Sequence, residues 1–221
     1  MNFIVSLVFI FLTSISLFSQ DFEGKIVFKI DIKGDFSAQE KMMLPSEAVT
    51  FCKGDKTRTE MTMGFGMNTT SIADSKTGNS VALMNLLGSK YAIETNGEAE
   101  NLENDKFSKN TIVDVTNETK TIAGYLCKKA IVKVTDPETK KTTEMDVWFA
   151  KDLNLNNGFA KGPLKKIEGA MLEFSLEQQG MNMNFQASSI TKQKVDDQMF
   201  VVPEGYKKMT QEDLMKMMGG R

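Results

Sequence analysis

Thioether side chains are the most unusual chemical groups in this sequence, which contains 16 methionines and no histidine. Two stretches, "MTMGFGM" and "MNMNFQA", place methionine and phenylalanine on alternate positions: Met61, Met63, Phe65 and Met67 in one, and Met181, Met183 and Phe185 in the other. Soft thioether ligands select Cu(I), so either series could hold a cuprous ion. The same alternation is typical of one apolar wall of a β-structure, either plain core or the lining of a lipophilic groove. Because phenylalanines interrupt both series, the copper site is the weakest of these three interpretations.

Other catalytic chemistry finds little support in the sequence. The absence of histidine removes Ser-His-Asp and Cys-His nucleophilic systems and every His-based metal site. The "GFG" at 64–66 lacks the Lys-Ser/Thr pair that follows a phosphate-binding glycine loop. Carboxylates are plentiful but scattered. We therefore expect a protein that is not an enzyme and that needs no cofactor and no metal.

The two cysteines, Cys52 and Cys127, are candidates for a disulfide, because an even count in an exported chain favours one. On the chain-entropy model, closing so long a loop would stabilise the fold by roughly 4–5 kcal/mol. The alternative is a pair of buried free thiols on separate strands. Two cysteines without histidine make a poor zinc site.

The N-terminal segment is expected to be a cleaved signal peptide covering residues 1–20. Residues 3–18 are almost continuously apolar, and Ser19 or Gln20 could occupy the cleavage site. No basic residue precedes the apolar run. The rival interpretation is a membrane anchor, but the run is shorter than the roughly 20 residues that a spanning helix prefers. No Cys follows for lipid attachment, and no other run is long enough to span a membrane.

Residues 21–221 suit one domain with a sizeable core. With 27 basic and 29 acidic residues, the chain has no basic excess to bind nucleic acid. Period-2 alternation predicts strands at 25–32, 57–65, 128–136, 142–150, 171–178, 181–187 and 195–203. The dipeptide Gln179-Gly180 predicts a hairpin between two of them. Frequent Gly, Asn-Gly and Asp-Pro turns indicate a mainly β protein, with about ten to twelve antiparallel strands and no internal repeat.

Two short helices and two long loops are also predicted. Ser37 with Glu40, and Thr210 with Asp213, have the spacing of N-terminal caps, so helices are expected at 37–44 and 210–218. The segments 96–110 and 152–169 are expected to be loops, which are either solvated connections or lids over a binding site.

Four segments resemble the domain of unknown function 4412 family (DUF4412) of exported Gram-negative proteins: "FCKGDKTRTEM" (51–61), "IAGYLCKKAIV" (122–132), "VWFAKDL" (147–153) and "MFVVPEGYKKM" (199–209). The resemblance spans nearly the whole mature chain but supplies no catalytic residues. It implies an architecture similar to that of the periplasmic lipoprotein carriers LolA and LolB, a single curved antiparallel sheet or half-barrel. Cys52 stands where we expect an aromatic residue, so a disulfide would be particular to this sequence.

A curved sheet of this kind predicts a hydrophobic ligand groove in its concave face. The expected lining is the two methionine series together with Phe174, while Met42, Met43 and Leu44 of the first helix would plug the groove. We expect the bound partner to be a lipid or another hydrophobic molecule of the periplasm or outer membrane. The alternative is a structural or interaction protein of the cell envelope that docks on another envelope protein through sheet edges or the 152–169 loop.

Overall fold

We describe a computed structural model of the chain. The described residues are 22–64, 67–86, 88–95, 108–155, 164, 167–178, 181–210, 213 and 216. The expected signal peptide and the 96–107 part of the first loop lie outside these residues.

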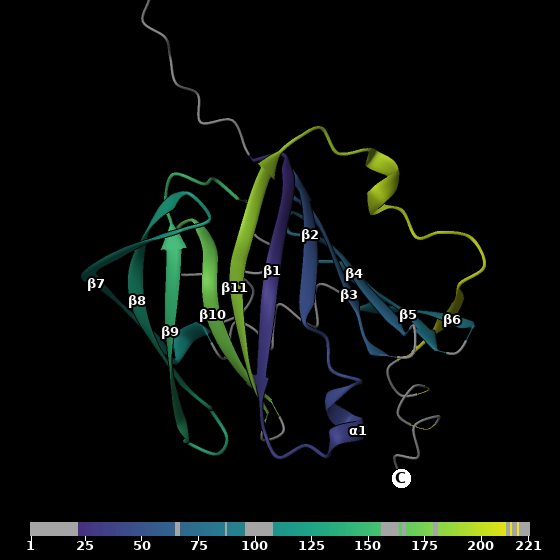
Figure 1. Ribbon diagram of the computed structural model, residues 1–221, viewed down its shortest axis with the longest axis horizontal. Coiled ribbons are helices and arrows are strands. Elements are labelled where there is room, and N and C mark those ends of the chain that lie inside the picture. The colour runs from purple at the N-terminus through teal and green to yellow at the C-terminus, as the bar shows by residue number, and fades with distance from the viewer. Residues whose placement is uncertain are drawn as a thin grey trace, which may run out of the picture.

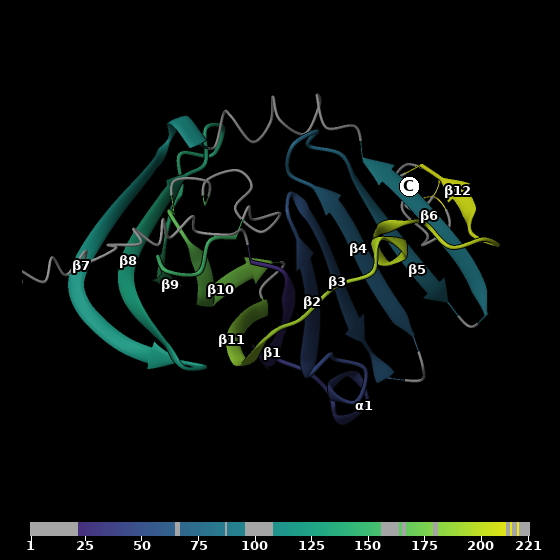
Figure 2. The ribbon, with the colours of Figure 1, turned by 90° about the horizontal axis from the view of Figure 1, so that it is seen from above.

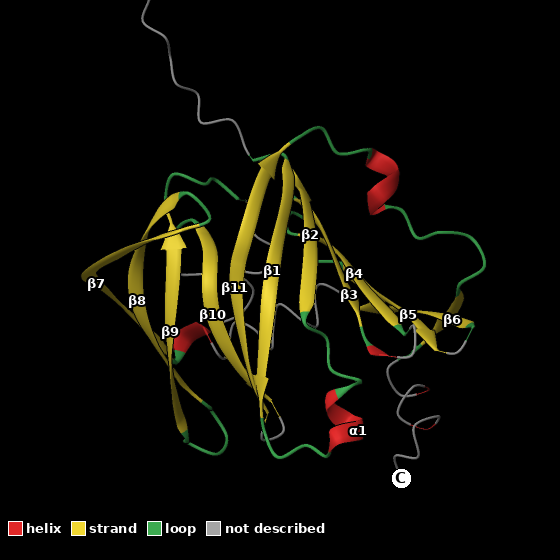
Figure 3. Ribbon diagram, in the orientation of Figure 1, coloured by secondary structure: helices red, strands yellow, loops and turns green. Residues whose placement is uncertain are grey.

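The fold is mainly β, as predicted from the alternation and the turns, and Figure 3 shows how few helices accompany the strands. The strands are β1 (Gly24–Lys33), β2 (Glu47–Lys53), β3 (Lys56–Thr62), β4 (Asn68–Asp74), β5 (Ser80–Leu86), β6 (Ser89–Thr95), β7 (Thr111–Ile122), β8 (Tyr125–Thr135), β9 (Thr142–Ala150), β10 (Ala170–Gln178), β11 (Met181–Lys192) and β12 (Lys207–Met209).

All described strands belong to one 12-stranded sheet, in the order β12-β6-β5-β4-β3-β2-β1-β11-β10-β9-β8-β7. Every pairing is antiparallel except that of β12, which runs parallel to β6. Because β1 pairs with both β2 and β11, the first strand lies near the middle of the sheet and joins its two halves. Figure 2 shows that the sheet is bent into an arch, open on one side.

The larger hydrophobic core lies on the concave face of the arch. Along β1 the even-numbered residues Ile26 and Phe28 are buried, while Lys29 and Asp31 are exposed, as the alternating sequence predicts. The register places partners of β1 on the same face, including Ala48 of β2 and Ala187 of β11. Phe28 also meets Phe174 of β10 edge to face, with ring centroids 6.1 Å apart.

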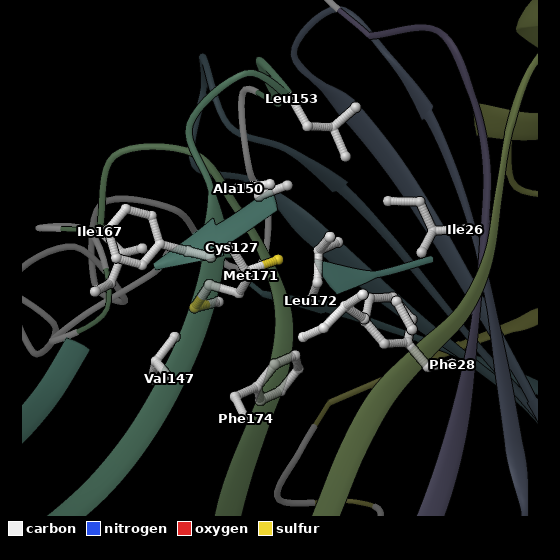
Figure 4. Packing of buried hydrophobic residues seen from close by; sticks show 14 of the residues in the cluster. Ile26, Phe28, Cys127, Val147, Ala150, Leu153, Ile167, Met171, Leu172 and Phe174 are labelled. Carbon is white, nitrogen blue, oxygen red and sulfur yellow. The ribbon is translucent and has the colours of Figure 1, made fainter. Parts of the chain in front are cut away.

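The β9–β10 connection completes this core at the upper end in Figure 1. Leu153, Leu164 and Ile167 belong to the same buried cluster as Phe28 and Leu172, and Figure 4 shows Leu153 beside the strands that carry the core. The backbone N–H of Phe22 donates to the carbonyl of Asn154 at 2.9 Å, which ties the start of the described chain to this connection. The predicted 152–169 loop is therefore partly a core element.

A smaller core lies on the opposite, convex face of the other half. Ile72, Leu83 and Ala92, from β4, β5 and β6, are buried under Phe200 and Tyr206. Both covering residues belong to the strap, the segment 193–206 that runs from β11 towards β12 (Figure 1). Two basic side chains of the sheet hold the strap: Lys53 Nζ bonds the Val195 carbonyl and Arg58 Nη1 bonds the Met199 carbonyl, both at 3.0 Å.

One strand prediction is wrong within the strap. Residues 197–200, expected to be part of a strand over 195–203, form the 3-10 helix η3 (Asp197–Phe200). Asp196 caps it, because its Oδ1 accepts the backbone N–H of Gln198 at 2.9 Å. A capping carboxylate competes with strand hydrogen bonding, which explains why the alternation was misleading here.

The β7–β8 hairpin bends back over the convex face of its own half. Its two-residue turn has positive φ at both Ala123 (47°) and Gly124 (87°), the backbone of a tight hairpin. Lys120 of β7 reaches Glu173 of β10 at 2.7 Å, although β8 and β9 lie between them in the sheet order. Its Nζ also lies 4.1 Å from the centre of the Trp148 ring. The sheet is thus strongly curled at this end.

The two predicted helix caps are present. Ser37 and Glu40 form a reciprocal capping box at the start of α1 (Ala38–Lys41), which is one turn long and ends earlier than predicted. Thr210 Oγ1 donates to the carboxylate of Asp213 at 2.6 Å and accepts its backbone N–H at 3.1 Å. Most of the second helix lies outside the described residues. Within the described part of the chain, no helix is long and apolar enough to cross a membrane.

Candidate functional site: an open apolar face

The apolar residues of the concave face become more exposed towards the lower end of Figure 1, where β1 ends and β11 begins. Along β1 the exposed fraction rises from 2% at Phe28 to 8% at Ile30, and Ile32 is only half-buried. The neighbouring strands show the same trend. We call the half-buried apolar residues of this end the open apolar face: Ile32, Met145, Leu176, Met181, Met183 and Phe185.

The register makes these residues one surface. Ile32 pairs with Met183, which pairs in turn with Leu176 of β10. Phe185 lies between Ile30 and Phe174, and its ring stacks on that of Phe174 with centroids 5.0 Å apart. These contacts hold the face on rigid strands rather than on a loop.

Charge is segregated to the other side of the same strands. Alternation directs one set of polar and charged residues to the convex face here: Lys29, Asp31, Lys33, Glu144, Asp146, Glu173, Glu177, Asn182 and Asn184. Ion pairs between residues of this set and nearby lysines lie on that face, such as Lys129–Asp146 at 2.8 Å. The open apolar face therefore offers contact to an uncharged, apolar molecule and no side chain suited to acid–base chemistry.

The predicted groove residues do not form one continuous wall. Met183 and Phe185, with Met181, form part of the open apolar face, whereas Phe174 is a core residue with 3% exposure. Met61 is half-buried against the larger core from β3. Phe65 lies outside the described residues.

The first methionine series does not continue as a strand. β3 ends at Thr62, and the Met63 N–H donates to the Met67 carbonyl at 2.8 Å across the β3–β4 turn. Met63 and Met67 therefore face each other across a turn instead of following one another along one wall. The copper interpretation stays a prediction, which titration with Cu(I) tests directly.

The predicted plug helix does not enter the groove. Figure 2 shows α1 outside the arch, and Met42 is 69% exposed, while Met43 and Leu44 are half-buried. This segment instead packs on the β3–β4 turn, where the Gly64 N–H donates to the Met43 carbonyl at 3.3 Å. A side chain at position 64 would collide with the Met42 carbonyl, so the turn needs glycine at this close approach. The plug prediction is wrong because the one-turn helix is too short to reach back over the sheet.

The candidate disulfide is not formed. Cys52 on β2 and Cys127 on β8 are both free and buried. Four strands lie between β2 and β8 in the sheet order, a spacing of roughly 24 Å along the sheet, whereas a disulfide needs Cα atoms within about 7 Å. Burial raises the pKa of the Cys52 thiol to about 12 and also raises that of Cys127. The alternative of two buried thiols on separate strands therefore describes the structure.

Five surface cavities of the described residues lie away from the open apolar face. One of about 660 Å³ lies between the strap and β4–β6, and is lined by Ile72, Val81 and Phe200 among others. Another of about 530 Å³ runs beside β7, between Val113 and Ile167. None of the five is lined by a predicted groove residue. The description of the open apolar face therefore rests on the exposure and the register of its residues.

Sequence reasoning missed Ile32, Met145 and Leu176. The signal was available, because each continues the apolar alternation of a predicted strand towards its lower end. What the alternation could not show is that the upper end is filled by the β9–β10 connection while the lower end remains open.

Comparison with protein families places the chain. The model of a domain of unknown function, DUF4412, matches residues 22–206, which is more than half of the chain. The chain belongs to the DUF4412 family. No curated protein matches it. The family assignment agrees with the resemblance of the four motifs, and the match extends from β1 to the end of the strap, just before β12.

Proposed function

We propose that this protein is an exported, non-enzymatic binding module that holds the apolar part of a lipid or another hydrophobic molecule. The observation that supports it is the open apolar face: six half-buried apolar side chains in register on rigid strands, with the charged residues of those strands on the other face. Contiguous apolar surfaces that stay accessible to solvent typically bind a ligand or a partner.

The chemistry of the face suits an alkyl or acyl chain. Each buried methylene contributes about 0.8 kcal/mol, so a chain of several methylenes would bind without any charged anchor. Methionine has three rotatable bonds and a polarizable sulfur, so Met145, Met181 and Met183 can adapt to chains of different length and shape. Adaptable side chains of this kind predict broad selectivity rather than recognition of one molecule.

The proposed compartment is the periplasm or the inner leaflet of the outer membrane of a Gram-negative cell. The apolar segment at residues 3–18 has the length of a signal-peptide core. The family match begins at residue 22, directly after that segment. Delivery of a hydrophobic molecule across an aqueous compartment is a role that such a protein could fill without chemistry.

The test is to purify the exported protein without detergent and to compare its native and denatured masses. We expect extra native mass that extracts into organic solvent, and binding of the neutral apolar dye N-phenylnaphthylamine to the stripped protein. A native mass equal to that of the polypeptide, together with no dye binding, would overturn the proposal.

A second candidate function is an interaction protein of the envelope. Three large apolar side chains of the β7–β8 hairpin are exposed: Ile112 (59%), Val115 (53%) and Leu126 (63%). β7 is the last strand of the sheet order, and a partner strand could extend the sheet there. An Ile112→Lys, Val115→Lys double variant should lose partner capture while still binding N-phenylnaphthylamine. Unchanged partner capture in this variant would rule out docking at the β7 edge.

A further inference from the structure

The open apolar face is built with oxidisable residues. Three of its six members, Met145, Met181 and Met183, are thioethers, and all three are half-buried. Their neighbours Ile32 and Leu176 occupy equivalent positions with hydrocarbon side chains. Aliphatic residues therefore fit this surface, so methionine is not required by the shape of the sheet.

Burial separates the methionines of the chain into classes. Met171 lies in the larger core with 4% exposure, where an oxidant cannot reach its sulfur. Met42, the residue after α1, is 69% exposed. Met145, Met181 and Met183 are intermediate, so an oxidant can reach them while the protein stays folded. Other methionines share this intermediate burial: Met43, Met61, Met63, Met67, Met84, Met199 and Met209. A place on the open apolar face distinguishes Met145, Met181 and Met183 from these others.

We propose that Met145, Met181 and Met183 form an oxidative modification site that controls binding at the open apolar face; this rests on the proposed function. The oxidant class is a peroxide. The methionine sulfur attacks one peroxide oxygen, the O–O bond breaks, and a sulfoxide S–O bond forms as sulfur loses two electrons. The second oxygen leaves as water with the two protons of hydrogen peroxide.

The effect of this modification follows from the surroundings. A sulfoxide is a strong hydrogen-bond acceptor and is polar and chiral, whereas the unmodified face has no charged side chain. Each oxidised sulfur retains its water on this surface, and an apolar ligand would have to displace that water without replacing its hydrogen bonds. Oxidation should release the bound molecule without unfolding the sheet, because the core beneath stays buried.

The experiment treats the purified full chain with graded hydrogen peroxide. Peptide mass spectrometry follows sulfoxide formation, and fluorescence follows N-phenylnaphthylamine binding. We expect Met42 to oxidise first, the three open-face methionines next and Met171 last. Dye affinity should fall by about tenfold or more as the three open-face methionines are oxidised, a loss that one or two polar groups placed in an apolar contact can produce.

Two variants sharpen the test. Met145→Leu, Met181→Leu, Met183→Leu should bind the dye as tightly as the unoxidised protein and keep that affinity in peroxide. The matched control Met42→Leu should lose binding in peroxide as the wild type does. Unchanged wild-type binding after full oxidation of the three methionines would overturn the modification site alone. Failure of the unoxidised protein to bind the dye would overturn the proposed function and the modification site with it.

Discussion

The two hydrophobic cores of the molecule use opposite faces of the same sheet. The larger core, around Phe28 and Phe174, lies on the concave face and is covered at one end by the β9–β10 connection. The smaller core, around Leu83, lies on the convex face and is covered by the strap through Phe200 and Tyr206. One cover leaves an apolar margin open at the lower end, whereas the other closes over a cluster of three buried residues.

The difference in how the two cores are covered indicates where a ligand can bind. The strap buries Ile72, Leu83 and Ala92, and the cavity of about 660 Å³ beside it has a mixed lining that includes Lys56, Asp74 and Glu94. A connection that fills only the upper end of a long concave face leaves Met183 and its neighbours half-exposed. Among the described residues, the larger core thus stabilises the fold and also leaves half-buried apolar side chains along its lower margin.

Phe28→Ala should have the largest effect on stability. Phe28 is 2% exposed and contacts the ring of Phe174, so its removal leaves a cavity at the junction of the two halves. We expect the free energy of unfolding to fall by about 3–5 kcal/mol. Urea unfolding followed by the fluorescence of Trp148, the single tryptophan, measures it. A loss below about 1 kcal/mol would show that the concave core is loosely packed.

Leu83→Ala should cost less, about 2–3 kcal/mol, because the strap can settle into part of the space left by the missing side chain. The destabilisation should be confined to the strap and the strands beneath it. Trypsin should cleave after Lys207 or Lys208 faster than in the wild type, while the Trp148 signal remains native. If resistance to trypsin and the native Trp148 fluorescence were lost together, the two cores would form one cooperative unit. The contrast drawn between the two cores would then be wrong.

Arg58→Met should release the strap at one point. The Arg58 guanidinium bonds both the Met199 carbonyl and Glu60, and its side chain is 15% exposed. Loss of this charged hydrogen bond should lower stability by about 1–2 kcal/mol. The same trypsin assay should show faster cleavage, and Lys129→Met, which breaks an ion pair away from the strap, is the control. Equal cleavage rates in the two variants would show that Arg58 does not hold the strap.

Acid should loosen the strap with a smaller effect. The Lys53 ammonium, 2.9 Å from Asp197, lowers the pKa of that carboxyl below its ordinary value of 3.8. Because the pKa of Asp197 is lower in the folded state, the contribution of this ion pair to stability is complete above pH 3.8. It is lost as the pH falls through the folded-state pKa. Strap cleavage by pepsin should therefore accelerate below pH 3.8, and Asp197→Asn should weaken this dependence. An unchanged dependence in that variant would assign it to other carboxylates.

The sheet could be predicted from the sequence better than the segments that pack against it. Alternation in β1 and β9, and the two capping motifs, are local signals, and each is present in the structure. In β5, by contrast, Val81 and Leu83 alternate with Ala82 and Met84, so both faces of the strand carry apolar side chains. The alternation therefore does not predict which face is buried. The short α1, the capped η3 and the placement of the β9–β10 connection depend on packing between distant segments, which alternation does not record.

The most direct test of the account compares Met183→Asp with Met42→Asp. Both variants add one carboxylate in place of methionine, but only Met183 belongs to the open apolar face, whereas Met42 is an exposed residue at the end of α1. Titration with N-phenylnaphthylamine should show at least about a tenfold loss of affinity for Met183→Asp and wild-type affinity for Met42→Asp. Wild-type affinity in a folded Met183→Asp protein would contradict the assignment of ligand binding to this face.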